Sequence, residues 1–213
     1  MRIICCRFGD KFTQWHVDNL KHMIDEYSGL KYDSFEVIED DLYGNWFNKF
    51  QMYDRFRDGE NLYFDLDVIV FKNIDQLFTW EPNQFCIIRD FNRHIRDDWK
   101  RMNSSVFRLS TGQHQYVWDN FIKQPEINSK KMHGDQDWIY AHIKNDFKFW
   151  PDEWIQSYKW EMRGKPTMAR VEGVRNFSHP GIPEIKPQTS VAVFHGEPYP
   201  HNCIDPWCKE NWY

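Results

Sequence analysis

Two hydrophobic periods alternate along the first 145 residues of the chain. Apolar runs typical of strands lie at 2–7, 32–38, 61–64, 85–88 and 104–109. Apolar residues three and four apart favour helices at 14–28, 46–56, 74–78, 112–122 and 135–143. Thr13 is a suitable N-cap for the first helix, and Ser28-Gly29 ends it. This alternation predicts an α/β sandwich, with helices flanking a mostly parallel central sheet.

The pattern changes from about residue 151. Prolines recur through this part, which predicts a loop-rich C-terminal tail. One apolar run, 191–194, stands out as a strand within it and leads into His195-Gly196. Because no internal repeat and no linker composition interrupts the chain, we expect a single domain over residues 1–213.

Two carboxylates follow the strand at 61–64 directly. Side chains alternate along an extended chain, so Asp65 and Asp67 should point the same way. Adjacent carboxylates repel each other, and a divalent cation relieves that repulsion. Open α/β sheets bind ligands at the carboxyl ends of their strands. The pair therefore predicts a metal site there, with a solvated strand end as the alternative.

His195 stands in a similar position, directly after a buried strand. If the two strands are neighbours, His195 completes a metal site with Asp65 and Asp67. Such a ligand set favours Mn²⁺, with Mg²⁺ as the alternative. A structural histidine is the competing interpretation. A zinc site built from His195, His201, Cys203 and Cys208 is a further alternative, although the spacing matches no standard zinc motif.

Two further polar segments lie beside predicted elements. Asp135 and Gln136 open the helix at 135–143, where they either face a ligand or cap the helix. Asn103 enters the strand at 104–109 and could bond a ligand hydroxyl or satisfy turn backbone.

Composition narrows the class of ligand. Aromatic residues make up 18% of the chain, with 11 Trp, 10 Tyr and 17 Phe, which suits an aromatic core or a groove that stacks on sugars or bases. The net charge of −5 and the lack of a basic block disfavour nucleic acid as a partner. No apolar run reaches the length of a membrane span. Five cysteines and an N-terminus without a signal-peptide core lead us to expect a cytoplasmic protein.

Four segments together resemble a known family. They are Tyr63-Phe64-Asp65-Leu66-Asp67-Val68, Asn103-Ser104-Ser105, Asp135-Gln136-Asp137 and His195-Gly196-Glu197-Pro198. Their order and spacing resemble those of GT-A glycosyltransferases of family 8, the group that includes glycogenin. The first segment is similar to the family's DxD motif, and the last to its C-terminal His-Gly element.

The resemblance implies a hexosyltransferase that moves a hexose, by family habit glucose from UDP-glucose, to an acceptor that the sequence leaves open. Retention of anomeric configuration is expected. The implied metal ligands, usually for Mn²⁺, are Asp65, Asp67 and His195. The residues implied to act on the transferred sugar are Asn103, Asp135 and Gln136. The residues implied to bind the nucleotide sugar are Cys6, Arg7, Phe8, Phe12, Lys49, Asp65, Asn103, Lys165 and Gly196.

One departure from the family concerns the diphosphate. Family members commonly carry a lysine shortly after the glycine of the His-Gly element, and this chain has Glu197-Pro198-Tyr199-Pro200 instead. The basic residues expected to replace it are Arg7, Lys49, Lys159, Arg163 and Lys165, and weak nucleotide binding is the alternative. We also expect an acceptor groove along the aromatic segment 147–165, with Trp150, Trp154, Tyr158 and Trp160.

A different class of protein would carry some of these features. A metal-dependent module that binds a carbohydrate or nucleotide without turnover is the main alternative. A glycosidase fits less well, because its two carboxyl groups must flank the scissile bond at a defined separation.

Overall fold

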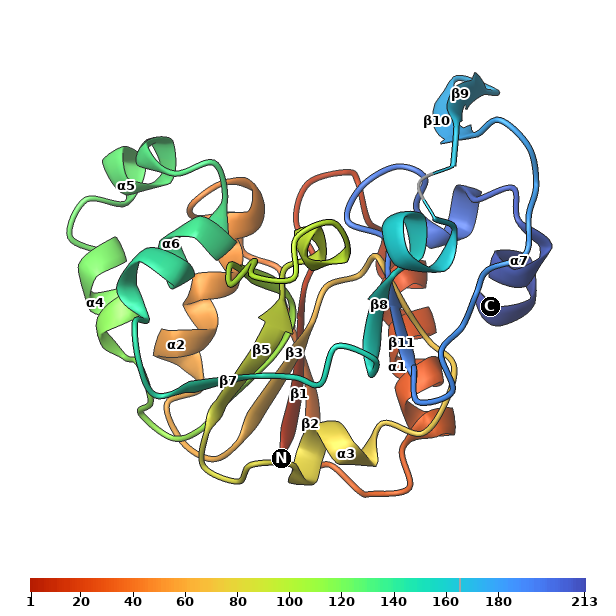
Figure 1. Cartoon of the computed structure of the whole chain (residues 1–213). Helices are drawn as coiled ribbons and strands as arrows, with labels where there is room; N and C mark the ends of the chain where they lie inside the picture. Colours follow the sequence, from red (N-terminus) through yellow and green to blue (C-terminus); the bar gives the residue numbers. More distant parts are fainter. Residues whose placement is uncertain (165) are drawn as a thin grey trace.

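The central feature of the computed structural model is a six-stranded sheet of order β2-β1-β3-β6-β5-β7 (Figure 1). The structure describes residues 1–164 and 166–213, apart from the side chain of residue 45. The strands of this sheet are β1 (Arg2–Cys6), β2 (Ser34–Ile38), β3 (Asn61–Phe64), β5 (Phe85–Arg89), β6 (Met102–Leu109) and β7 (Phe147–Phe149).

Five strands of this sheet point the same way, and β6 is reversed. β1 pairs in parallel with β2 and β3, and β5 pairs in parallel with β7. β6 lies antiparallel between β3 and β5. The predicted mostly parallel α/β sheet is therefore confirmed. The reversal of β6 places its first residues beside the carboxyl end of β3.

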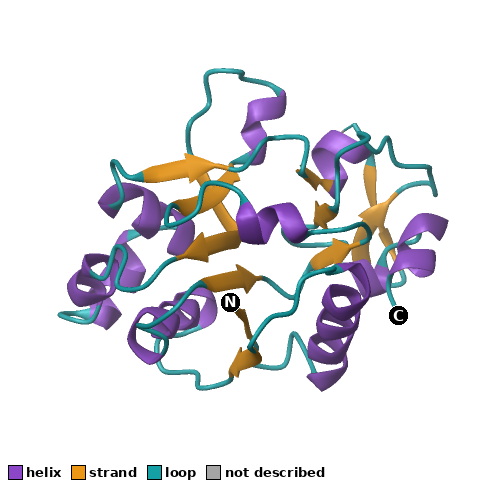
Figure 2. Ribbon diagram, turned by 90° about the horizontal axis from the view of Figure 1, so that it is seen from below, coloured by secondary structure: helices purple, strands orange, loops and turns teal. Residues whose placement is uncertain are grey.

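Alternating side chains divide the sheet into two buried faces. In β1, Ile3 and Cys5 belong to one core cluster, whereas Ile4 and Cys6 belong to the other. The first cluster includes residues of α1 (Gln14–Tyr27) and α3 (Asp75–Thr79). The second includes residues of α2 (Gln51–Arg55), α4 (Tyr116–Phe121) and α6 (Asp135–His142). Figure 2 shows helices on both sides of the strands. The short helix α5 (Pro125–Lys131) lies beyond α4 and α6 (Figure 1).

A second sheet of three strands sets the position of the C-terminal part. Its order is β4-β11-β8, formed by Val68–Val70, Val191–Val193 and Ile155–Ser157. β11 pairs antiparallel with β4, with Val193 opposite Val68, and parallel with β8. The chain thus leaves the large sheet after β3 and enters the small sheet at β4. Asp65 and Asp67 occupy that crossing, next to the end of β11.

The structure corrects several predicted elements. The helix expected at 46–56 is a 3₁₀ turn, Asn45–Phe50, followed by α2, and the helix expected at 112–122 is reduced to α4. The tail contains the hairpin of β9 (Met168–Val171) and β10 (Val174–Phe177), and ends in α7 (Pro206–Asn211). These pieces, like β7 and β8, are too short to display a hydrophobic period, so the sequence did not predict them. Among the described helices, none combines the length and apolar character needed to cross a membrane.

Candidate active site

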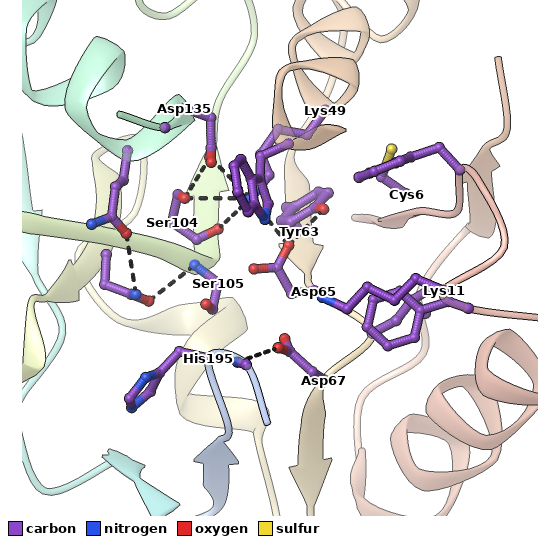
Figure 3. A pocket seen from close by; sticks show the side chains of 18 of the residues that line it. Cys6, Lys11, Lys49, Tyr63, Asp65, Asp67, Ser104, Ser105, Asp135 and His195 are labelled. Atoms are coloured by element: carbon purple, nitrogen blue, oxygen red, sulfur yellow. Dashed lines mark hydrogen bonds and ion pairs between the residues drawn. The ribbon is translucent and has the colours of Figure 1, made fainter. Parts of the chain in front are cut away.

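A pocket of about 360 Å³ opens at the carboxyl edge of the large sheet. Six described segments form its walls: the loop after β1, the 3₁₀ turn before α2, the crossing after β3, the start of β6, the start of α6 and the turn after β11 (Figure 3). Its volume falls in the range of small-molecule sites. Most residues that the sequence predicted for nucleotide-sugar and metal binding line it, namely Cys6, Phe8, Phe12, Lys49, Asp65, Asp67, Asn103, Asp135, Gln136, His195 and Gly196.

The acidic pair faces into this pocket (Figure 3). Asp65 Oδ1 accepts hydrogen bonds from Lys49 Nζ at 3.0 Å and from the Tyr63 hydroxyl at 2.9 Å. Asp67 is 7% exposed, and its Oδ2 accepts from the backbone N–H of Gly196 at 3.2 Å. Burial, and next the charge of Asp65, raise the pKa of Asp67. Two crowded carboxylates fit a divalent cation, and among the described residues the buried one, Asp67, forms no ion pair.

Lys49 forms the polar floor of the pocket. Its Nζ lies 3.0 Å from Asp65 Oδ1 and 3.0 Å from Asp135 Oδ2, and its side chain is 3% exposed. Burial acts to lower the pKa of Lys49, but the charges of Asp135 and Asp65 outweigh it and raise that pKa. The Asp135 carboxylate also accepts from the Ser104 hydroxyl. The charge of Lys49 is therefore already paired with those of Asp65 and Asp135 within the protein.

An amide pair forms the wall opposite the loop after β1. Asn103 Nδ2 donates to Gln136 Oε1 at 3.4 Å, and Asn103 Oδ1 accepts from the backbone N–H of Ser105 at 3.1 Å. These residues come from the start of β6 and the first turn of α6. The structure thus brings together Asn103 and Gln136, which the sequence proposed as sugar contacts. The long bond between them is one that ligand hydroxyls can replace.

The imidazole of His195 does not reach the acidic pair. Its Nε2 lies 2.6 Å from Ser157 Oγ, and its ring stacks on Phe91 with centroids 5.4 Å apart. Figure 3 shows the ring turned away from Asp67. Burial, and next the charge of Lys159, lower the pKa of His195 to about 3, so the ring is neutral. The backbone after β11 touches Asp67 through Gly196, whereas the predicted ligand ring does not.

Among the described residues, one trio of His, Cys, Asp or Glu brings all its ligand atoms within 4.8 Å: Cys203, Asp205 and Cys208. The trio predicted for a metal, with His195, is therefore not assembled in this structure. The alternative zinc set is not assembled either, because His195 and His201 are not part of the buried trio. Asp205 in that trio is paired with Arg163 and accepts from the Tyr158 hydroxyl.

The loop after β1 divides the residues predicted to border the base. Cys6, Phe8 and Phe12 line the pocket, but Arg7 is not among its lining residues. The Arg7 guanidinium forms an ion pair with Glu39. Burial, above all, raises the pKa of Cys6 to about 12, which keeps its thiol protonated. That Arg7 binds the ligand therefore stays a prediction, and in this structure its charge is paired with Glu39, directly after β2.

The basic residues expected to hold a diphosphate are also engaged elsewhere. Lys159 Nζ donates to the carbonyls of His195, Gly196 and Glu197, at 3.1, 3.2 and 3.0 Å. Arg163 pairs with Asp205. Lys165 lies outside the described residues.

None of residues 147–164, the described part of the aromatic segment, lines the pocket. Trp150 and Tyr158 are buried in the core, at 2% and 0% exposure. These two side chains therefore do not line a groove in this structure, and the acceptor groove along the segment stays a prediction. The exposed aromatic side chain among the lining residues is instead Trp46, at 48% exposure.

Sequence reasoning missed several residues that line the pocket: Lys11, Trp46, Tyr63, Ser104 and Tyr199. Strand alternation could have found Tyr63, because it lies two residues before Asp65 and so faces the same side. Lys11 and Tyr199 lie in loops that meet only in three dimensions, and no local pattern signals their contact.

Comparison with known proteins rests on structure. No protein-family model and no curated protein sequence matches the chain. The glycosyltransferase GlyE of Streptococcus pneumoniae TIGR4 superposes with a TM-score of 0.57 at 16% identity, over 75% of this chain and 48% of GlyE. The apo form of GlyE gives 0.65 at 13% identity, over 94% of this chain and 56% of GlyE. The chain thus spans about half the length of these GlyE chains.

A second neighbour matches along nearly its full length. A structure of the galactosyltransferase LgtC with donor and acceptor sugar analogs superposes with a TM-score of 0.66 at 11% identity, over 99% of this chain and 93% of LgtC. An active-site mutant of LgtC gives a TM-score of 0.68 over the same shares. At such low identities the likeness speaks for the fold. The chain therefore has the GT-A glycosyltransferase fold, as its resemblance to family 8 led us to expect.

Proposed function

We propose that residues 1–213 form one glycosyltransferase domain, which moves a sugar from a nucleotide diphospho-sugar to an acceptor hydroxyl. UDP-glucose is the leading donor and retention the expected stereochemistry, both from the resemblance to family 8. The observation that carries the proposal is the gathering of an acidic pair, Asp65 and Asp67, and an amide pair, Asn103 and Gln136, in one pocket at the carboxyl edge of a GT-A sheet.

The acidic pair is the proposed cation site. Asp65 and Asp67 would hold Mn²⁺, or Mg²⁺ as the alternative, and the cation would neutralise charge on the departing diphosphate. The protein supports this site through fixed contacts, because Tyr63 and Lys49 orient Asp65 and the Gly196 N–H orients Asp67. His195 can act as a third ligand only after its ring leaves Ser157.

The remaining residues have roles in positioning. In the transfer, the bond between the anomeric carbon and the phosphate oxygen breaks, and a bond to the acceptor oxygen forms. The acceptor hydroxyl gives its proton to the phosphate oxygen that the broken bond releases, and this proton leaves with the nucleotide diphosphate. The amides of Asn103 and Gln136 would hold sugar hydroxyls on the wall opposite the loop after β1. Asp135 would fix the floor through Lys49, since its carboxylate is already bound there.

The test is release of nucleotide diphosphate from a panel of nucleotide diphospho-sugars, with Mn²⁺ and then with EDTA. We expect metal-dependent release with at least one donor. Asp67→Ala should lower the rate by about 100-fold or more, the scale of losing one group that stabilises transition-state charge. Asp98→Ala, at an exposed loop position outside the pocket, is the matched control and should keep the wild-type rate.

Two outcomes would count against the proposal. Wild-type turnover in Asp67→Ala would remove the acidic pair from the reaction. Binding of a nucleotide or sugar without any release, unaffected by EDTA, would instead identify a binding module. NMR of the product's anomeric centre tests retention separately.

A further inference from the structure

The charges that line the pocket are unevenly paired. Of the residues that the structure describes, four aspartates and two lysines line it, and no arginine does. One of the lysines, Lys49, is fixed between Asp65 and Asp135 in the buried floor. The second, Lys11, is exposed, and none of the hydrogen bonds or ion pairs among the described residues involves its ammonium group. For an anionic ligand that enters the pocket, the available ammonium group is therefore that of Lys11.

Two aromatic rings hold Lys11 at the pocket wall. Its Nζ lies 4.6 Å from the ring centroid of Phe12 and 4.5 Å from that of Tyr199. These rings pack edge to face, with centroids 5.8 Å apart. Attraction between the ammonium and both rings restrains the flexible side chain without using up its N–H donors. The cation is thus restrained, yet still able to donate hydrogen bonds.

The side chain is also directed at the proposed cation site. Figure 3 shows Lys11 reaching from the loop after β1 toward Asp65 and Asp67. The positive charge of Lys11 acts to lower the pKa of Asp67, whereas burial raises that pKa. A diphosphate bridging to a cation on the acidic pair would lie within the same part of the pocket.

Three other basic side chains that the sequence proposed for the diphosphate are engaged. Lys159 is bound to three backbone carbonyls, Arg163 to Asp205, and Arg7 to Glu39. Tyr199 itself occupies the segment after Gly196 in which the sequence lacks a basic residue. The contact between Lys11 and Tyr199 therefore brings a lysine from the N-terminal loop to that segment in space.

We propose that Lys11 binds the diphosphate of the nucleotide donor, held for that purpose by Phe12 and Tyr199. This inference rests on the proposed function, which supplies the donor's chemical class. Phosphate oxygens accept hydrogen bonds from the ammonium, and its charge offsets the charge that remains on the diphosphate after the bond to the sugar breaks. Contacts with these two aromatic rings set the position of the Lys11 ammonium group.

Calorimetric titration with UDP, uridine and inorganic pyrophosphate, each in the presence of Mn²⁺, tests this role. Lys11→Met should weaken binding of UDP and pyrophosphate by about 10- to 100-fold, the range for a charged hydrogen bond. Uridine binding should stay within about twofold, because uridine has no phosphate. Lys11→Arg should recover most of the affinity for UDP. Lys144→Met, at an exposed position outside the pocket, is the matched control.

The outcomes separate this inference from the proposed function. Equal UDP and pyrophosphate affinities in Lys11→Met and wild type would overturn the role of Lys11, while metal-dependent donor turnover could still hold. An equal loss of uridine and UDP binding would also overturn it, because the lysine would then act on the base or the loop. Pyrophosphate binding that depends on Lys11, without turnover of any donor, would support the inference and contradict the proposed function.

Discussion

The two lysines of the pocket occupy opposite environments. Lys49 is buried in the floor, where Asp65 and Asp135 neutralise it, and its position is set by the β3–β6–α6 side of the fold. Lys11 is exposed on the wall formed by the loops after β1 and β11, and contacts Phe12 and Tyr199. We infer from this difference that the paired charge of Lys49 serves structure and that the unpaired charge of Lys11 serves ligand binding. We therefore expect substitutions of Lys49 to affect folding first, and those of Lys11 to affect ligand affinity first.

The largest expected effect comes from Lys49→Met. Removing this charge leaves the buried Asp135 carboxylate without its cationic partner and next to the half-buried Asp65, so we expect the free energy of unfolding to fall by about 3–5 kcal/mol. Lys11→Met is the matched comparison and should change stability by less than about 0.5 kcal/mol, because its side chain is exposed. Urea denaturation of both variants measures the contrast. Equal stability of the two variants would show that Lys49 does not hold the floor together.

A smaller effect concerns His195, whose ring is bound to Ser157 in this structure. If His195 becomes a third ligand, His195→Ala should weaken Mn²⁺ binding by about tenfold, the lower end of effects around metal sites. Ser157→Ala should not weaken it, because this change frees the ring. Titrations with Mn²⁺ in the presence of UDP compare the variants. If neither variant alters Mn²⁺ affinity and both lower the melting temperature, His195 has a structural role instead.

The smallest effect is expected for Arg7→Gln. Exposed ion pairs such as that between Arg7 and Glu39 contribute little to stability, so the variant should remain folded. Arg7 is also not among the residues that line the pocket. The KM for the donor should therefore change by less than about twofold, in contrast to Lys11→Met. Steady-state kinetics with the best donor would measure both. A tenfold rise in KM for Arg7→Gln would mean that the guanidinium leaves Glu39 when the donor binds.

Much of the fold and part of the pocket were predictable from sequence. The strands of the large sheet have clear apolar runs, and alternation correctly directed Asp65 and Asp67 toward one pocket. The segments holding Asn103 and Gln136 were identified because polar residues interrupt the ends of apolar elements. These features depend on residues that are close together in the sequence, so sequence patterns reveal them.

The rest depends on contacts between distant segments. The ring of His195 turns away because Ser157 and Phe91, from β8 and a 3₁₀ turn, receive it. Lys11 lies at the acidic pair because Tyr199, almost the whole chain away, supports it. Neither partner has a sequence signal linked to the residue that it contacts. Side-chain direction at loop ends is therefore where sequence reasoning failed.

The most direct test of the account is a Mn²⁺ titration followed by electron paramagnetic resonance, which detects the free ion. In the presence of UDP, we expect wild-type protein to remove about one Mn²⁺ per chain from solution, as a single cation on the acidic pair requires. Asp67→Asn should leave the free-ion signal nearly as large as in buffer with UDP alone. Equal Mn²⁺ uptake by wild type and Asp67→Asn would contradict the claim that Asp65 and Asp67 hold the cation.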